Sequence, residues 1–253
     1  MKIGIFSLTD NNYIKGTTTL YHSINENTNL KSYNVDLCTI SKDKLVYDNT
    51  LGIKDYIIHD DTGLEHSSTY TRFKNTTKKF NALLRDEYDR IIILDSDMLC
   101  ISDLSELFTF KMNAPIVACE DFGSVHYYPN QIKECGLDIN HKFVNTGLMM
   151  FERPYIGAEF YKQLINTFST YKTYDQGDQG YINAYIQHNK LNVEPLLPTK
   201  YNYALDGHYP RYNISDISII HYTGMKPWDG LYDNLPYKLW AKYNQDMKNK
   251  GKI

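Results

Sequence analysis

The clearest pattern in the chain is an apolar run at 91–94, which follows Arg90 and ends at two carboxylates. Three of its four residues are β-branched isoleucines, and the run is too short for a helix, so it predicts a strand buried on both faces. Asp95 and Asp97 come next, and their spacing lets both side chains reach one hard cation. Open α/β sheets bind ligands at the carboxyl ends of their strands. An isolated Asp-x-Asp is, however, also typical of an ordinary acidic turn.

Short apolar runs alternate with helix-like segments along the rest of the chain. The expected strands are 2–8, 34–40, 55–59, 90–94, 114–119, 146–151 and 214–220. The expected helices are 13–25, 41–44 with Ser41 as N-cap, 76–87, 102–108 with Ser102 as cap, 154–171, 178–188 and 234–249. Residues 60–69 and 121–142 are expected to be loops, the second lying over a site. The alternation predicts one α/β domain over 1–253, with a Rossmann-like, mostly parallel mixed sheet flanked by helices.

The composition of the chain argues against some classes of binding partner and for others. The 253 residues carry a net charge of −3, which gives no general field for nucleic acid or an anionic membrane. No apolar run approaches the ~20 residues that span a bilayer, and the first residues are typical of a strand rather than a signal peptide. Four widely spaced cysteines without a C-x-x-C pair favour reduced thiols and a cytoplasmic location. The 23 tyrosines hint at sugar binding, because their rings offer an apolar face and a hydroxyl.

Three further polar clusters lie at the ends of predicted strands or in the loops beyond them. Asn145-Thr146-Gly147 precedes a strand. The segment 175–180 combines two acids, two amides and two glycines at a helix start, where an ordinary acidic first turn is the alternative, since Asp complements the helix dipole. The segment 221–228 follows the last strand. Together these clusters could surround one ligand.

The segment 221–228 could complete a site for a metal and a diphosphate. His221 could join the two carboxylates as a metal ligand. Gly224 could let the backbone approach a phosphate, and Lys226 could pair with that phosphate as a point charge. Taken singly, His221 is more often a hydrogen-bonded buried histidine, and Trp228 is more often a core residue. The combination is far more specific than any of its parts.

In this order, the clusters resemble the family-8 glycosyltransferases, whose best-known member is glycogenin. The resemblance extends from residue 3 to residue 228. The matching motifs are Leu8-Thr9 with Tyr13, Lys79 sixteen residues before the metal motif, Leu94-Asp95-Ser96-Asp97, Asn145-Thr146-Gly147, Asp178-Gln179-Gly180-Tyr181-Ile182-Asn183, and 221–228. The resemblance implies a single domain of the GT-A fold, a UDP-sugar donor, Mn²⁺ (with Mg²⁺ as the alternative), and transfer with retention at the anomeric carbon.

The resemblance also implies a role for each matching residue. Asp95, Asp97 and His221 would ligate the metal. The donor nucleotide and its phosphates would be held by Leu8, Thr9, Tyr13, Lys79, Ser96, Gly224 and Lys226. The transferred sugar and the acceptor would be faced by Asn145, Asp175, Asp178 and Gln179. Gly224 and Lys226 are one residue closer together than is usual in the family, which makes the phosphate loop tighter.

Donor, acceptor and mechanism stay open at this stage. The resemblance favours UDP-glucose, then UDP-galactose, and an acceptor that is a glycan, a glucan or a protein tyrosine. Self-glucosylation would use Tyr209 or Tyr212, although neither aligns cleanly. A homodimer is expected from relatives alone, and retention through a covalent intermediate or on a single face is equally open. The alternatives are a non-catalytic binder of sugar nucleotides or glycans, and a nucleotidyltransferase. The latter normally has a glycine-rich basic loop after its first strand, which 8–13 lacks.

Overall fold

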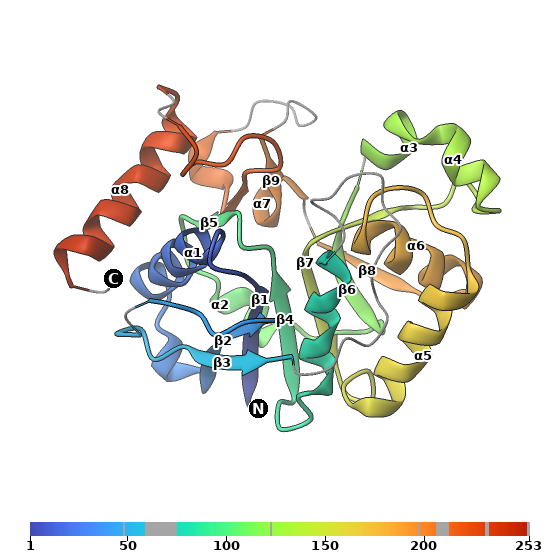
Figure 1. The fold of residues 1–253 in the computed structure, drawn as a ribbon, viewed down its shortest axis with the longest axis horizontal. Coiled ribbons are helices and arrows are strands. Elements are labelled where there is room, and N and C mark those ends of the chain that lie inside the picture. Colours follow the sequence, from blue (N-terminus) through green and yellow to red (C-terminus); the bar gives the residue numbers. More distant parts are fainter. Residues whose placement is uncertain are drawn as a thin grey trace.

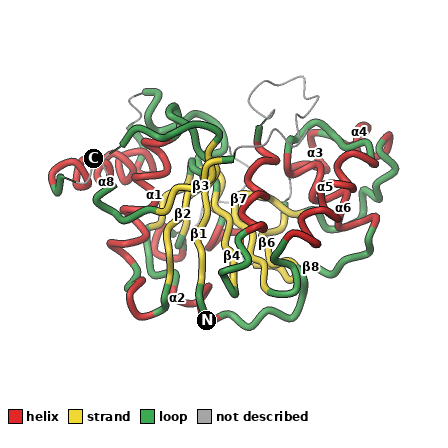
Figure 2. The backbone as a smooth tube through the Cα atoms, turned by 60° about the horizontal axis from the view of Figure 1, so that its bottom comes forward, coloured by secondary structure: helices red, strands yellow, loops and turns green. Residues whose placement is uncertain are grey.

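The computed structural model describes residues 1–47, 49–58, 75–121, 123–196, 198–205, 213–230 and 233–251. Its centre is a seven-stranded sheet in the order β3-β2-β1-β4-β7-β6-β8. The strands are β1 (Ile3–Leu8), β2 (Val35–Ser41), β3 (Lys54–Ile57), β4 (Arg90–Leu94), β6 (Ile116–Glu120), β7 (Val144–Glu152) and β8 (Val193–Leu196). β7 runs antiparallel to β4 and β6, and the other pairs are parallel. This confirms the predicted mostly parallel mixed sheet (Figure 2).

A second, smaller sheet lies beside the first. It has three strands in the order β5-β10-β9, namely β5 (Met98–Cys100), β10 (Ile219–His221) and β9 (Tyr203–Ala204). β10 runs antiparallel to β5, with His221 opposite Met98. This pairing brings β10, with His221, next to the carboxylates that precede β5.

Helices cover both sides of the central sheet (Figures 1 and 2). The α-helices are α1 (Ile14–Asn27), α2 (Ser105–Thr109), α3 (Gly123–Tyr127), α4 (Pro129–Glu134), α5 (Ala158–Thr170), α6 (Asp178–His188), α7 (Pro198–Tyr201) and α8 (Leu235–Asn249). The 3₁₀ helices are η1 (Leu30–Ser32), η3 (Thr76–Leu84) and η4 (Ile214–Asp216). α1 packs against α8 and β5, and α5 packs against α6 and η3. Among the described residues, no helix has the length and apolarity needed to cross a membrane.

β4 is buried on both faces, as its sequence predicts. Ile91 and Ile93 join the core cluster that includes residues of η3, α5 and α6, whereas Ile92 and Leu94 join the cluster that includes residues of α1 and α2. Successive side chains of a strand point to opposite faces, and each fully buried isoleucine stabilises the fold by roughly 1.5–3 kcal/mol. β4 ends at Leu94, so Asp95 is the first polar residue after the buried run and lies at the edge of the sheet.

Three expected helices differ from the structure. The segment 41–44 is not helical, because Ser41 is the last residue of β2 and pairs with Ile57 of β3. The segment 76–87 forms the 3₁₀ helix η3, in which the Asn81 side chain donates to the carbonyl of Lys78 and so competes with α-helical bonding. The segment 154–171 becomes helical only at Ala158, after a turn.

Three further expectations need correction. The segment 214–220 begins as the 3₁₀ helix η4, capped by the Asn213 side chain, and only Ile219–His221 is a strand. Ser102 does not cap α2; its hydroxyl bonds that of Ser218, and Asp103 accepts from the backbone of Ser105 instead. The expected loop 121–142 contains α3 and α4. The expected loop 60–69 lies outside the described residues.

Candidate active site

A cavity of about 680 Å³ opens at the edge of the sheet where β1 and β4 end and β7 begins. Of the predicted site residues, it is lined by Leu8, Thr9, Tyr13, Lys79, Asp95, Ser96, Asp97, Asn145, Asp178, Gln179, His221 and Lys226. Asp175 and Gly224 are not among its lining residues. Residues that lie far apart in the sequence thus share one concave site, which is the usual location of a ligand in an α/β protein.

Asp95, Asp97 and His221 form a compact cluster in this cavity. Nε2 of His221 lies 3.2 Å from Oδ1 of Asp97 and 3.8 Å from Oδ2 of Asp95. One ligand atom from each residue lies within 4.8 Å of the other two. Two carboxylates and one imidazole are a donor set that suits Mn²⁺ and similar divalent ions. The chemistry of the donors therefore fits the metal that the sequence predicts.

Two lysines face the carboxylates of this cluster. Nζ of Lys226 lies 2.5 Å from Oδ2 of Asp97 and 2.7 Å from the carbonyl oxygen of Tyr222. Burial raises the pKa of Asp97, but His221 and Lys226 outweigh it and hold the net pKa below its usual range. Burial raises the pKa of Asp95, and Lys79 opposes this only in part. Asp97 is therefore the more strongly anionic of the two.

The ammonium group of Lys79 is fully engaged by the protein. Nζ lies 2.5 Å from Oδ1 of Asp95, 2.8 Å from Oδ2 of Asp178 and 3.2 Å from the carbonyl oxygen of Thr146. Burial lowers the pKa of Lys79, but Asp178 and Asp95 raise it to a net value above the usual range. An ammonium has three N–H donors, and these three neighbours surround it, so this lysine orients two carboxylates.

Gly147 makes room for the imidazole of His221. A Cβ at this position would lie 2.6 Å from Cε1 of His221, 2.7 Å from its Nδ1 and 2.6 Å from Cε of Met98. The carbonyl of the same glycine accepts from the backbone N–H of Asp95 at 2.9 Å. The Asn145-Thr146-Gly147 motif therefore has a steric role beside the cluster, which its sequence alone did not reveal.

The loop after β1 forms part of the cavity wall. Oδ1 of Asp10 accepts the backbone N–H groups of Asn12 and Tyr13 at 2.8 and 2.9 Å, which fixes the turn. The Tyr13 ring packs edge-on against Trp228, with centroids 5.5 Å apart. Burial raises the pKa of Tyr13, so its hydroxyl stays protonated and able to donate. Asp10 also lines the cavity, but the sequence analysis did not name it as a site residue. An Asp at the start of a polar turn is the sequence feature that could have indicated it.

Gln179 and Asn145 differ in how much of each amide remains for a ligand. Nε2 of Gln179 donates to Ser124 and Gln176, and its Oε1 accepts from the backbone of Thr146. Asn145 accepts at Oδ1, and its Nδ2 donates to no atom of the described residues. Asn145 is thus equipped to donate to a substrate, whereas Gln179 mainly holds the cavity wall together.

Comparisons with known proteins show the family and the fold of this chain. The sequence pattern of Glycosyl transferase family 8 matches residues 4–231. The chain belongs to glycosyltransferase family 8. Its fold matches the crystal structure of galactosyltransferase LgtC in complex with donor and acceptor sugar analogs, with a TM-score of 0.71 and 13% identity over 99% of this chain and 100% of that chain. The fold is therefore of the GT-A type.

Two curated relatives in this family are glycogenin-1 of Caenorhabditis elegans and lipopolysaccharide 1,2-glucosyltransferase of Escherichia coli. The first is 27% identical over 178 residues, which cover 66% of this chain and 36% of that protein. The second is 26% identical over 176 residues, which cover 61% of this chain and 46% of that protein. The family-8 chain thus spans less than half the length of both relatives.

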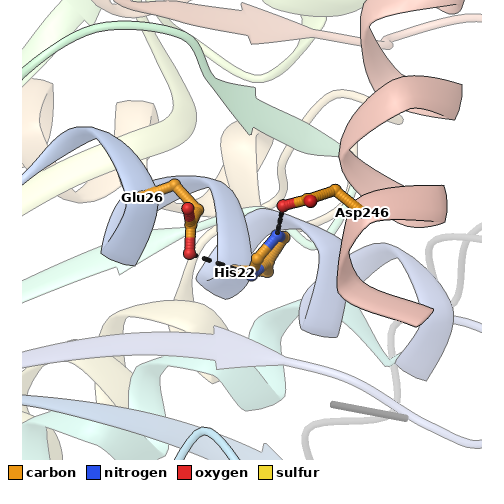
Figure 3. Close-up of side chains that lie close together, drawn as sticks. All are labelled: His22, Glu26 and Asp246. Atoms are coloured by element: carbon orange, nitrogen blue, oxygen red, sulfur yellow. Dashed lines mark hydrogen bonds and ion pairs between the residues drawn. The ribbon is translucent and has the colours of Figure 1, made fainter. Parts of the chain in front are cut away.

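A second cluster of metal-binding residue types lies outside the cavity of this family-8 chain. His22 and Glu26 on α1 face Asp246 on α8, and the imidazole lies 2.9 Å from the Asp246 carboxylate (Figure 3). Nζ of Lys250 lies 2.7 Å from Glu26 and 2.9 Å from Asp246, so an ammonium group already bridges the two carboxylates. This cluster therefore joins α1 to α8, and the metal candidate is the one in the cavity.

Proposed function

We propose that this family-8 chain is a retaining hexosyltransferase that moves glucose from UDP-glucose, with Mn²⁺ or in its place Mg²⁺, to an acceptor. UDP-galactose is the next candidate donor. The single observation that carries the proposal is the meeting of Asp95, Asp97 and His221 with Lys226 in one cavity. Two acids, one imidazole and an adjacent lysine are suited to holding a diphosphate through a cation. A glycan, a glucan or a protein tyrosine would accept the sugar, and Tyr209 and Tyr212 lie outside the described residues.

The cavity offers two ends for the two halves of such a donor. Thr9 and Tyr13, in the fixed turn after β1, would hold the base and ribose, together with Leu8 and Ser96. Asn145 and Asp178 line the cavity from β7 and the start of α6, and they would face the transferred sugar. Asp175 would contribute only through the acceptor, because it does not line the cavity.

Breaking the sugar–phosphate bond leaves negative charge on the departing UDP. A bound divalent cation would act as a Lewis acid toward the diphosphate. Lys226 would donate to the same oxygens from a site that already holds it beside Asp97. Asn145 would donate its amide N–H to the sugar, and Lys79 would hold the Asp178 carboxylate in place next to it. Both routes to retention remain open.

The test is intact mass after incubation with Mn²⁺ and UDP-glucose, with UDP release followed in parallel. Added masses of one hexose unit each would support self-glucosylation, and peptide mapping would then examine Tyr209 and Tyr212. UDP release with unchanged mass would support transfer to a separate acceptor or hydrolysis. No UDP release with any common UDP-sugar would overturn the proposal in favour of a non-catalytic sugar-nucleotide binder.

A further inference from the structure

Asn202 is a fully buried asparagine between α7 and β9 that the sequence analysis did not single out. It does not line the cavity. Its side-chain amide lies between two residues that do. One end is 2.7 Å from Oδ1 of Asn145, and the other is 2.7 Å from Nδ1 of His221. A buried amide that touches two site residues without reaching the site is placed to orient them.

The backbone of Gly147 fixes which end of each amide faces which neighbour. A backbone N–H can only donate, so the atom of Asn145 that lies 2.8 Å from it is the oxygen Oδ1. The same oxygen faces Asn202, which must therefore present Nδ2 as the donor. The opposite end of Asn202 is then Oδ1, an acceptor, and it faces His221.

This polarity decides the tautomer of His221. An acceptor at 2.7 Å from Nδ1 requires the proton to be on Nδ1. In the neutral ring the lone pair is then on Nε2, and Nε2 is the atom that lies 3.2 Å from Asp97 and 3.8 Å from Asp95. A lone pair aimed at two carboxylate oxygens is suited to sharing a cation with them.

We propose that Asn202 is a positioning residue that holds His221 in the Nδ1–H tautomer, so that Nε2 is ready to ligate the metal beside Asp95 and Asp97. This inference rests on the proposed function, because it concerns the same metal site. The relay runs from the Gly147 N–H through Asn145 and Asn202 to His221. It therefore also links the asparagine proposed to face the sugar to the metal ligand.

The variants Asn202→Leu and Asn202→Asp separate positioning from simple packing. Leucine removes the acceptor for Nδ1–H, and loss of such a partner typically lowers metal affinity by about 10–100-fold. Aspartate keeps an oxygen acceptor toward His221 but loses the N–H donor toward Oδ1 of Asn145, so it should bind the metal more tightly than the leucine variant. Asn244→Leu is the matched control: Asn244 is also buried, but it bonds Thr19, which lies outside the cavity lining.

The readouts are Mn²⁺ affinity, from the electron paramagnetic resonance of free Mn²⁺, and the ¹⁵N shifts of the His221 ring. We expect the wild type and Asn244→Leu to bind Mn²⁺ alike, Asn202→Leu to bind it more weakly than either, Asn202→Asp to bind it more tightly than Asn202→Leu, and the wild-type ring to be protonated at Nδ1. Equal affinity in Asn202→Leu, or a wild-type ring protonated at Nε2 alone, would overturn the inference and leave the proposed function standing. No Mn²⁺ binding by the wild type would remove the metal site and the inference together.

Discussion

Nζ of Lys79 lies 2.8 Å from Oδ2 of Asp178, and this buried ion pair ties η3 to the first residue of α6. The same ammonium lies 2.5 Å from Asp95, so one lysine connects the proposed sugar end of the cavity with the proposed metal end. A movement of the Asp95 carboxylate would therefore also move Lys79 and, through it, the Asp178 carboxylate, and the reverse.

Replacing Lys79 with methionine should destabilise the protein strongly. The change leaves two largely buried carboxylates without their cation, and removing one partner of a buried pair costs about 3–5 kcal/mol. The free energy of unfolding in urea measures the effect. The double variant Lys79→Met/Asp178→Asn should recover part of the loss, because one of the two charges is gone. A loss below about 1 kcal/mol in the single variant would show that the pair is well solvated.

Asp97→Asn should abolish metal-dependent turnover and leave the fold intact. A metal acting as a Lewis acid contributes several kcal/mol to the transition state, so UDP release should fall on the order of 100–1000-fold. The matched control is Asp233→Asn, whose carboxylate is 97% exposed. Circular dichroism checks the fold. Full activity of Asp97→Asn in Mn²⁺ would refute the metal assignment.

Gly147→Ala should weaken both the fold and Mn²⁺ binding. The new methyl group would lie 2.6 Å from Cε1 of His221 and must displace that ring or Met98. Overpacking of this kind costs about 1–3 kcal/mol. Gly224→Ala is a sharp control, since a Cβ there meets no described atom within 4 Å. Melting temperature and Mn²⁺ affinity should fall in the first variant, whereas the second should keep the wild-type stability. Equal stability of both alanine variants would contradict the steric argument.

The ion pairs of Asp246 should make stability depend on acid pH. Hydrogen bonds from Lys250 and then from His22 hold the pKa of Asp246 below its usual value. Figure 3 shows the contact with His22. A carboxylate with a lowered folded-state pKa stabilises the protein above its unfolded value of about 3.9 and loses that contribution as pH falls through the folded value. Asp246→Asn should therefore lower the melting temperature at pH 7, by at most about 2–4 °C because the pair is exposed.

As pH falls below the unfolded value of about 3.9 and through the lowered folded value, the difference between Asp246→Asn and the wild type should shrink, because the wild-type carboxyl becomes protonated as well. Glu26 and His22 on α1 and Lys250, the residue after α8, belong to the same cluster as Asp246. Asp233→Asn is therefore measured alongside as an exposed control outside the cluster. A difference that persists unchanged to pH 2 would assign the effect to packing instead of charge.

The sequence predicted the helices and strands whose conformation follows from the residues within the element itself. β4 is an unbroken apolar run, and the helix 178–188 matches the bounds of α6. The helix 41–44 was wrong because Ser41 takes its conformation from β3, which no local pattern around Ser41 reveals. β5, β8 and β9 have only two to four residues each, and each is a strand because it pairs with a segment distant in sequence. The spacing of apolar residues therefore could not predict them.

In the candidate site, too, some residues could be predicted from the sequence and others could not. Acids and the histidine are recognisable as chemical groups, and the structure brings Asp95, Asp97 and His221 together. Asn202 carries no such signal, because a lone asparagine before a short strand is indistinguishable from a turn residue. Its importance depends on a chain of hydrogen bonds from β7 to β10. Roles that depend on a neighbour's orientation become visible only in three dimensions.

The pairing of β5 with β10 also means that the two parts of the candidate metal site are made at different times. Asp95 and Asp97 leave the ribosome about 120 residues before His221 and Lys226. At 5–20 residues per second, the nascent chain carries its acidic motif for on the order of ten seconds without the imidazole and ammonium that later face it. The acidic motif is therefore synthesised first, and the candidate metal site is complete only after β10 and the loop that follows it have been made.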